Sequence, residues 1–348
     1  MMKKLWIFSI LFLFFIKNFN AQTANTKASE DGSLVNWMSF KEAFEKNKKT
    51  PKPFLIDIYT DWCGWCKHMM KTTYAVPELA SYINANFYAV KFDAETHDTI
   101  EYLGEKFINQ SSEKKSTHQL AYKLLGNNIS YPSTIFMNNN FQYSLLSAGY
   151  MEVNKIEPLL VFTLENVFRT TQYEKFKENY ELAFVDTNKK VLSNNLKVYS
   201  MSQALELCKK EPRKILVDIY TNWCNSCRIM NRTTYRDTAV AAYLNKNYYF
   251  VDFNAENKDV IQYEGQTFTQ DPSKSPFHPF ASYVLKGRFI LPSQVIINED
   301  QKVADSIPFY LSPETLYPIL KFYGEDIYKT TPWADYYKKY SEKNNQKK

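Results

Sequence analysis

The stretch DIYTDWCGWCK spans Asp57–Lys67, and a near copy, DIYTNWCNSCR, spans Asp218–Arg228. Each stretch continues a short apolar run, Phe54–Tyr59 or Ile215–Tyr220, of the kind found in buried strands. A polar turn with two cysteines follows, and apolar residues then recur at helical spacing. The sequence therefore places each cysteine pair where a buried strand gives way to a helix.

The two stretches belong to a repeat that covers most of the chain. Cys63 and Cys224 are 161 positions apart, and about half of the positions from Asp57 to Glu95 are identical to their counterparts at that offset. Further on the offset is 160, as in the pair His118 and His278. This period is far too long for a solenoid unit, so each copy should form its own core.

The length also predicts two domains, because 348 residues exceed what one core usually serves. We expect the boundaries to follow the repeat: signal peptide 1–21, first domain 34–181, linker 182–195, second domain 196–341 and basic tail 342–348.

Composition and charge indicate whether the chain is globular, whether it is exported and which partners it could bind. Hydrophobic residues make up 45% of the chain, which is typical of a globular protein. A basic start, the apolar run Leu5–Ile16 and a small residue at Ala21 predict an export signal. Its removal would take away three lysines and lower the formal charge from +6 to +3, which argues against a nucleic-acid partner. In an oxidising compartment, a close cysteine pair is a structural disulfide or a redox device.

The spacing of the cysteines favours redox chemistry. Cys63 would lie in the first turn of a helix, where unpaired N–H groups favour the thiolate and make it the nucleophile. Cys66 lies on the same face and could resolve a mixed disulfide. Asp57, on the buried strand six residues before Cys63, should have a raised pKa and could accept the proton of Cys66. Cys224, Cys227 and Asp218 repeat this arrangement.

The order of elements predicts the fold class. Each copy is expected to have a helix, a strand, the helix after the cysteines, a second strand, a helix, two more strands and a closing helix from Val153 or Pro313. This order indicates an α/β fold: two tandem domains, each a central mixed sheet flanked by helices.

These residues carry a resemblance. W-C-x-x-C after a strand, with an aspartate six residues upstream and a later proline, resembles the thioredoxin superfamily. More narrowly, both copies are similar to secreted thioredoxin-like domains that resemble the C-terminal domain of the bacterial thiol:disulfide interchange protein. The resemblance implies that Pro132 and Pro292 are cis-prolines facing the cysteines. It also implies a set of substrate-binding residues: Trp62, Gly64, Trp65, Tyr131, Pro132, Trp223, Leu291 and Pro292.

The two copies differ at positions that matter for this resemblance. Gly64-Trp65 becomes Asn225-Ser226, and Lys91, the family's lysine near the buried aspartate, becomes Asp252. We expect both changes to shift the redox potential. The residue before the proline is Tyr131 in the first copy and Leu291 in the second, and this difference predicts different partner preferences. Each copy also has an insert, 96–116 or 257–276, longer than in a minimal thioredoxin, and such inserts often shape binding faces.

The same residues allow other interpretations. A zinc site would need four ligands, and His68 has no counterpart in the second copy, so no metal is expected. A static disulfide remains open for each pair. His118 and His278 are interpreted as structural groups rather than catalytic bases, and Cys208 as a buried inert thiol.

The prediction is therefore an exported thiol:disulfide oxidoreductase that exchanges disulfides with protein thiols in the periplasm or outside the cell. By resemblance it leans toward reduction with electrons from a membrane partner, while oxidation and isomerisation stay open. No cofactor is expected besides the disulfides Cys63–Cys66 and Cys224–Cys227. The alternative is a peptide-binding or chaperone-like protein in which one or both redox sites are not essential. We expect two active but unequal sites.

Overall fold

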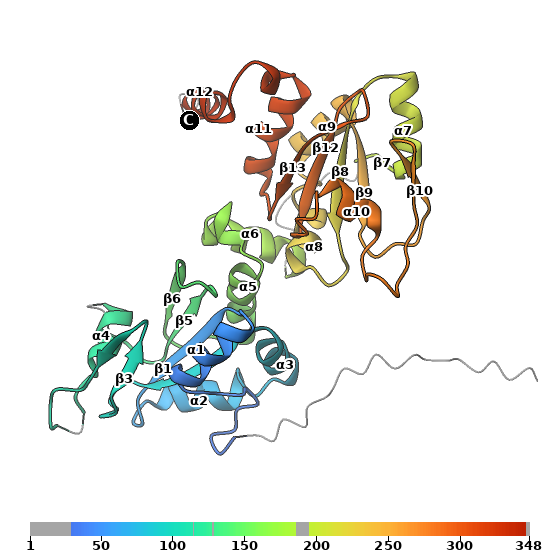
Figure 1. Cartoon of the computed structure of the whole chain (residues 1–348). Helices are drawn as coiled ribbons and strands as arrows, with labels where there is room; N and C mark the ends of the chain where they lie inside the picture. The colour runs from blue at the N-terminus through green and yellow to red at the C-terminus, as the bar shows by residue number, and fades with distance from the viewer. Residues whose placement is uncertain (1–28, 114, 127–128, 186–194, 346–348) are drawn as a thin grey trace, which may run out of the picture.

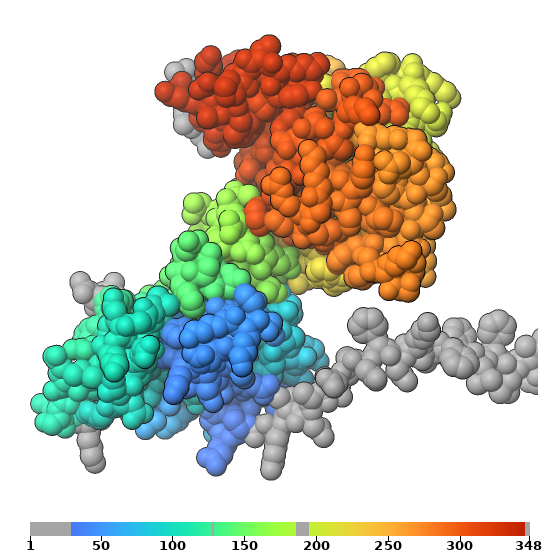
Figure 2. All heavy atoms as spheres, in the orientation of Figure 1, coloured from blue at the N-terminus to red at the C-terminus, as the bar shows by residue number. Residues whose placement is uncertain are grey.

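The computed structural model describes residues 29–113, 115–126, 129–185 and 195–345. The predicted signal peptide and most of the predicted linker lie outside the described residues. Two lobes meet through the segment that contains α5 (Val153–Leu164) and α6 (Tyr173–Phe184), coloured green in Figures 1 and 2. No helix among the described residues is long and apolar enough to cross a membrane.

The first domain is built from short helices and strands in alternation. Its elements are α1 (Phe40–Lys49), β1 (Phe54–Tyr59), α2 (Gly64–Thr72), α3 (Pro77–Asn86), β2 (Tyr88–Asp93), β3 (Ile100–Tyr102), β4 (Glu105–Phe107), α4 (Gln119–Leu125), β5 (Ser133–Met137), β6 (Ser144–Ala148), α5 (Val153–Leu164), the 3₁₀ turn η1 (Val167–Arg169) and α6 (Tyr173–Phe184).

The second domain repeats this order after one short additional strand. Its elements are β7 (Val198–Tyr199), α7 (Met201–Lys210), β8 (Lys214–Tyr220), α8 (Asn225–Arg232), α9 (Thr238–Asn247), β9 (Tyr248–Asn254), β10 (Ile261–Tyr263), β11 (Gln266–Phe268), α10 (Pro279–Val284), β12 (Ser293–Ile297), β13 (Val303–Pro308), α11 (Pro313–Gly324), the 3₁₀ turn η2 (Ile327–Lys329) and α12 (Trp333–Asn345).

Both central sheets are mixed, as the sequence predicts. The first has the order β2-β1-β5-β6, with β1 parallel to β2 and antiparallel to β5. The second has the order β13-β12-β8-β9-β7. The sheet register places Asp57 beside Lys91 and Asp218 beside Asp252. The inserts form the separate hairpins β3–β4 and β10–β11.

The closing helices begin at Val153 and Pro313 as predicted, and the strand predicted at Phe54–Tyr59 has those bounds. The strand predicted at Ile215–Tyr220 begins one residue earlier, at Lys214. Helix α6 ends at Phe184, three residues beyond the predicted boundary of the first domain. Strand ends depend on hydrogen bonds to a neighbouring strand, which a single segment of sequence does not reveal.

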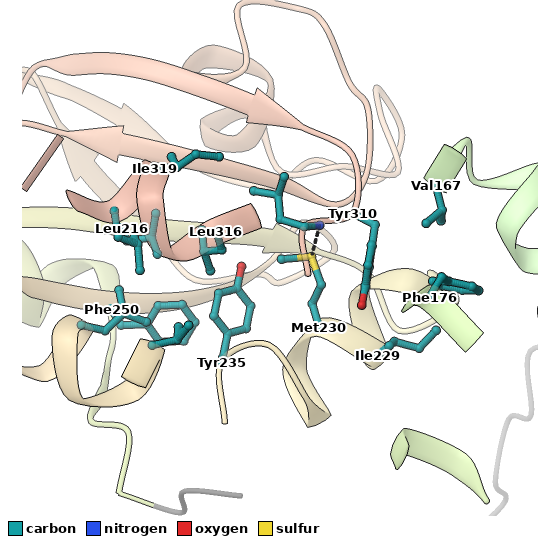
Figure 3. Packing of buried hydrophobic residues seen from close by; sticks show 14 of the residues in the cluster. Val167, Phe176, Leu216, Ile229, Met230, Tyr235, Phe250, Tyr310, Leu316 and Ile319 are labelled. Carbon is teal, nitrogen blue, oxygen red and sulfur yellow. Dashed lines mark hydrogen bonds between the residues drawn. The ribbon is translucent and has the colours of Figure 1, made fainter. Parts of the chain in front are cut away.

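The expectation that each copy forms its own core needs a correction. In the first domain, separate apolar clusters lie on the two faces of the sheet. In the second domain, one of the two clusters also contains six side chains from the first domain, namely Val161, Phe162, Val167, Phe176, Tyr180 and Ala183. Figure 3 shows Val167 and Phe176 beside Tyr310, Ile229 and Met230 of the second domain.

The two domains are therefore joined by a continuous apolar core as well as by the chain. Polar contacts surround this junction: Lys175 pairs with Glu314 at 3.2 Å, and Arg232 donates to the carbonyl of Ala183 at 3.1 Å. The guanidinium groups of Arg228 and Arg232 lie 5.2 and 5.0 Å from the ring of Phe184. Since the core of the second domain includes α5 and α6, the two domains should not separate without exposing apolar surface.

Candidate functional site

Each cysteine pair lies at the start of a helix that follows a central strand. Cys63 is the N-cap residue of α2, and its Sγ accepts a hydrogen bond from the backbone N–H of Cys66 at 3.1 Å. Cys63 and Cys66 form a disulfide with their Cα atoms 5.3 Å apart. The N–H groups of the first turn would favour a thiolate at Cys63 once this disulfide is reduced.

The second pair has the same local geometry. Cys224 is the N-cap residue of α8, its Sγ accepts from the N–H of Cys227 at 3.2 Å, and the two cysteines form a disulfide. All four of these cysteines are buried.

A buried aspartate lies on the strand that leads into each site. Asp57 is fully buried, and desolvation raises the pKa of its carboxyl to about 7, against the lowering effects of Lys91 and of a hydrogen bond from Tyr74. Burial likewise raises the pKa of Asp218 to about 7. Both pKa values are shifted upward, as the sequence predicted. A carboxyl with a pKa near neutrality can both accept and return a proton.

The groups around the two aspartates differ. In the first domain Asp57 has a lysine as its neighbour on the adjacent strand, whereas in the second Asp218 has Asp252, whose pKa burial raises to about 6. The charge of Asp252 adds to the rise at Asp218, and hydrogen bonds from Tyr235 at 2.7 Å and Gln294 at 3.2 Å oppose it. The two carboxyls should therefore titrate as a coupled pair.

Exposed aromatic side chains surround the first cysteine pair. Trp62 is 56% exposed and Trp65 is 62% exposed. The ring of Trp62 meets that of Tyr131 edge-on with centroids 6.1 Å apart, and Trp65 lies 5.5 Å from Tyr150 and 5.6 Å from His68. Tyr131 directly precedes Pro132, and the bond between them is cis, as the resemblance implied. The structure thus brings Tyr131, which precedes the cis bond, against the ring of Trp62, the neighbour of Cys63 in the sequence.

The second cysteine pair has different surroundings. Trp223 is 60% exposed and donates to Glu256 at 3.0 Å, just as Trp62 donates to Glu95 at 2.8 Å. Leu291 precedes a cis bond to Pro292 and packs against the core of the second domain. Ser226, however, is 0% exposed, whereas its counterpart Trp65 reaches into solvent.

The cover over Ser226 comes from the first domain. Glu165, just after α5, accepts hydrogen bonds from the backbone N–H groups of Asn225 at 3.0 Å and Ser226 at 2.7 Å. Its Oε2 atom also lies 3.9 Å from Sγ of Cys224. The sequence interpretation missed Glu165, and no local signal marks it, because its counterpart Glu325 is also a glutamate and touches no cysteine pair.

The histidines have structural contacts, in agreement with their interpretation from sequence. His118 and His278 are buried N-cap residues of α4 and α10, and each accepts a backbone N–H through Nδ1, from Leu120 and from Phe280. Cys208 is a buried free thiol, and burial raises its pKa. Among the described residues, no group of three or more histidine, cysteine or acidic side chains is arranged to hold a metal ion.

Two segments of the chain match models of known protein families. Residues 22–186 match the Thioredox_DsbH family model, described as a protein of unknown function, DUF255. Residues 197–281 match a family model described as thioredoxin-like. Each domain thus matches a thioredoxin-type family model.

Curated relatives match a short part of this thioredoxin-like chain. An uncharacterized protein of Caenorhabditis elegans is 32% identical over 79 residues, which are 22% of this chain and 11% of the relative. Spermatogenesis-associated protein 20 of Rattus norvegicus is 29% identical over 79 residues, 22% of this chain and 10% of the relative. The chain thus spans about a tenth of the length of the curated relatives it matches.

Three solved structures are each similar to less than half of this chain. A DsbH oxidoreductase is 18% identical with a TM-score of 0.28, covering 39% of this chain and 90% of that one. The C-terminal domain of Neisseria meningitidis DsbD, in its reduced form, is 16% identical with a TM-score of 0.24, covering 34% of this chain and 88% of that one. A putative disulphide-isomerase from Bacteroides thetaiotaomicron is 20% identical with a TM-score of 0.27, covering 38% of this chain and 94% of that one.

Proposed function

We propose that this chain is a thiol:disulfide oxidoreductase that reduces disulfides in exported proteins, chiefly through its first domain. The observation that carries the proposal is the arrangement at Cys63. A cysteine at a helix N-cap is paired with Cys66 in a disulfide, a buried carboxyl with a pKa of about 7 lies on the preceding strand, and exposed aromatic rings flank the site.

The reaction follows from these groups. With the pair reduced, the Cys63 thiolate attacks a substrate disulfide, forming a mixed disulfide and releasing one substrate thiolate, which takes a proton from water. Asp57 then accepts the proton of Cys66, whose thiolate attacks Sγ of Cys63 and releases the second substrate thiolate. The substrate gains two electrons, and the Cys63–Cys66 disulfide forms, which is the state that the structure holds.

Each further turnover needs a dithiol donor to reduce Cys63–Cys66. We propose a membrane-bound donor and a location in the periplasm or outside the cell. The support for this location is the basic and apolar start of the sequence. Oxidation or isomerisation would use the same cysteines, and the redox potential decides the direction.

The aromatic rings around Cys63 suit an unfolded or extended protein substrate. Trp62, Trp65 and Tyr150 offer large apolar surfaces with few rotatable bonds, a composition that favours binding at low entropic cost. The second domain has a serine in place of Trp65, and that serine is covered by Glu165.

A second candidate applies to the second domain. Because the first domain covers Ser226 and approaches Cys224, the second site could serve chiefly as a binding or structural copy whose disulfide is not needed for turnover.

The test is insulin reduction with dithiothreitol as the donor, comparing the wild type with Cys63→Ser, Cys224→Ser and the double variant. We expect Cys63→Ser to lose most of the turnover and Cys224→Ser to keep most of it. If the wild type and both single variants were as inactive as the double variant, the enzyme proposal would fail. Trapping of mixed disulfides with Cys66→Ser and Cys227→Ser would then show whether each site captures its own substrates.

A further inference from the structure

Glu165 of the first domain lies against the redox helix of the second. Its two carboxylate oxygens accept separate hydrogen bonds, Oε1 from the N–H of Asn225 at 3.0 Å and Oε2 from the N–H of Ser226 at 2.7 Å. The Glu165 side chain is partly buried, and its Oε2 atom lies 3.9 Å from Sγ of Cys224. Both oxygens thus contact the first turn of α8, next to the atom that would act as the nucleophile.

This position has a direct chemical consequence. The N–H groups at a helix start are what stabilises a cysteine thiolate there. A carboxylate that uses two of them competes with the thiolate for the same partial positive charge and adds a negative charge beside the sulfur. Burial raises the pKa of Glu165, and the hydrogen bonds from Ser226 and Asn225 oppose that rise because they favour the charged form.

The other charged groups near α8 do not place a positive charge beside Sγ of Cys224 that would offset the negative charge of Glu165. Arg228 and Arg232, further along α8, lie against the ring of Phe184. On the strand side, Asp218 and Asp252 are carboxyls with pKa values raised to about 7 and about 6, so any charge they carry is also negative.

The first domain provides an internal comparison. Within the described residues, no carboxylate accepts a hydrogen bond from the N–H of Gly64 or Trp65, the counterparts of Asn225 and Ser226. Glu325 is the counterpart of Glu165 in the second domain, and it is exposed and contacts Lys321 at 3.3 Å and Tyr243 at 3.4 Å. Both repeats therefore carry the glutamate, but only Glu165 reaches a redox helix.

We propose that Glu165 is a positioning residue of the second redox site, supplied by the first domain: it occupies the N–H groups of Asn225 and Ser226, leaves the Cys224 sulfur the N–H of Cys227, and adds negative charge beside that sulfur. Cys224 is thereby the weaker nucleophile of the two sites, and Cys224–Cys227 is the disulfide harder to reduce. The inference rests on the proposed thiol exchange at this site and names the group that sets its potential. Destabilising a thiolate destabilises the reduced pair, which shifts the equilibrium toward the disulfide.

The experiment measures the Cys224 thiol directly in the full chain carrying Cys63→Ser and Cys66→Ser. After reduction and removal of the reductant, the rate of alkylation of Cys224 by iodoacetamide is followed from pH 4 to 10 by mass spectrometry of its peptide. The oxidised fraction of Cys224–Cys227 is then measured in glutathione buffers at pH 7. The variants are Glu165→Gln, which removes the charge at nearly constant shape, Glu165→Asp, which keeps it, and Glu325→Gln as the matched control.

We expect Glu165→Gln to move the midpoint of the alkylation profile down by about one pH unit, which at pH 7 is roughly a tenfold gain in thiolate. The glutathione equilibrium should move toward the reduced pair by a similar factor. Glu165→Asp should stay near the wild type, and Glu325→Gln should match it.

Two results would overturn the proposal. One is an unchanged alkylation profile and equilibrium in a Glu165→Gln chain with the wild-type circular dichroism spectrum. The other is a faster rate at every pH with an unchanged midpoint, because that would mean that Glu165 only blocks access. Neither result bears on insulin reduction through Cys63, so failure here is distinguishable from failure of the proposed function.

Discussion

The buried carboxyl of Asp57 should make the protein less stable as the pH rises, and Asp57→Asn should relieve this. The pKa of Asp57 is about 7 in the folded protein, against 3.8 for an ordinary aspartate in water. Between these two values the folded state holds the proton more tightly than the unfolded state, so the free energy of unfolding falls as the pH rises from about 4 to about 7. The shift of about three units corresponds to a loss of about 4 kcal/mol above pH 7.

Replacing the carboxyl with an amide removes this loss but weakens the contact with the Tyr74 hydroxyl, which is worth about 1 kcal/mol. We therefore expect Asp57→Asn to raise the free energy of unfolding by about 2–3 kcal/mol at pH 8 and to leave it unchanged or slightly lower at pH 4. The same substitution should slow insulin reduction by roughly 10²-fold or more, because the resolving cysteine loses its proton acceptor.

The assay is urea unfolding of the oxidised chain at pH 4 and pH 8, followed by circular dichroism, with differential scanning calorimetry of the same samples. Asp61→Asn is the matched control, since Asp61 lies in the turn that follows the same strand but is exposed, and it should change the stability little at either pH. An equal gain at both pH values, or a larger gain at pH 4, would refute the reasoning that desolvation of a charged Asp57 destabilises the fold.

Three further outcomes are expected. Asp252→Asn should stabilise the chain more at pH 8 than at pH 4, because the raised pKa of Asp218 includes repulsion from Asp252. For the same reason, the pH profile of the step in which Cys227 resolves a mixed disulfide should shift downward. Equal effects on stability at both pH values would contradict this. Phe176→Ala should lower the free energy of unfolding, measured by urea titration, by about 3–5 kcal/mol, because its ring is fully buried in the core that the two domains share. Tyr336→Ala, at the matched position of α12, should have a smaller effect in the same titration. His118→Ala should lower the free energy of unfolding by about 1 kcal/mol through loss of the α4 cap. The rate of insulin reduction should stay within about twofold of the wild-type rate, and a much larger loss would show a catalytic role.

Much of each domain could be predicted from local sequence. The apolar run Phe54–Tyr59 followed by a polar turn defined the strand and the helix start, because a strand buried on both faces and a helix N-cap each impose their own residue types. The raised pKa of Asp57 followed from a carboxyl on a strand of that kind, and the capping roles of His118 and His278 agree with their place before short apolar helices.

The junction between the domains could not be predicted in this way. Val167 and Phe176 look like ordinary core residues of the first domain, and only the packed structure shows them in a cluster with Tyr310 and Met230. Apolar burial is not directional, so the pattern of a helix shows which face is buried but not which domain covers it.

The sequence by itself determined that the chain has two similar cysteine-pair sites, since the cysteine spacing, the preceding strand and the upstream aspartate are local features and occur twice. The tertiary structure alone decided that the sites are unequal in their surroundings: Trp65 is exposed to solvent, whereas its counterpart Ser226 is covered by Glu165. The physical reason is that the N–H groups at a helix start attract any nearby negative charge, and the chain fold decides whether a thiolate or a carboxylate from another domain lies there.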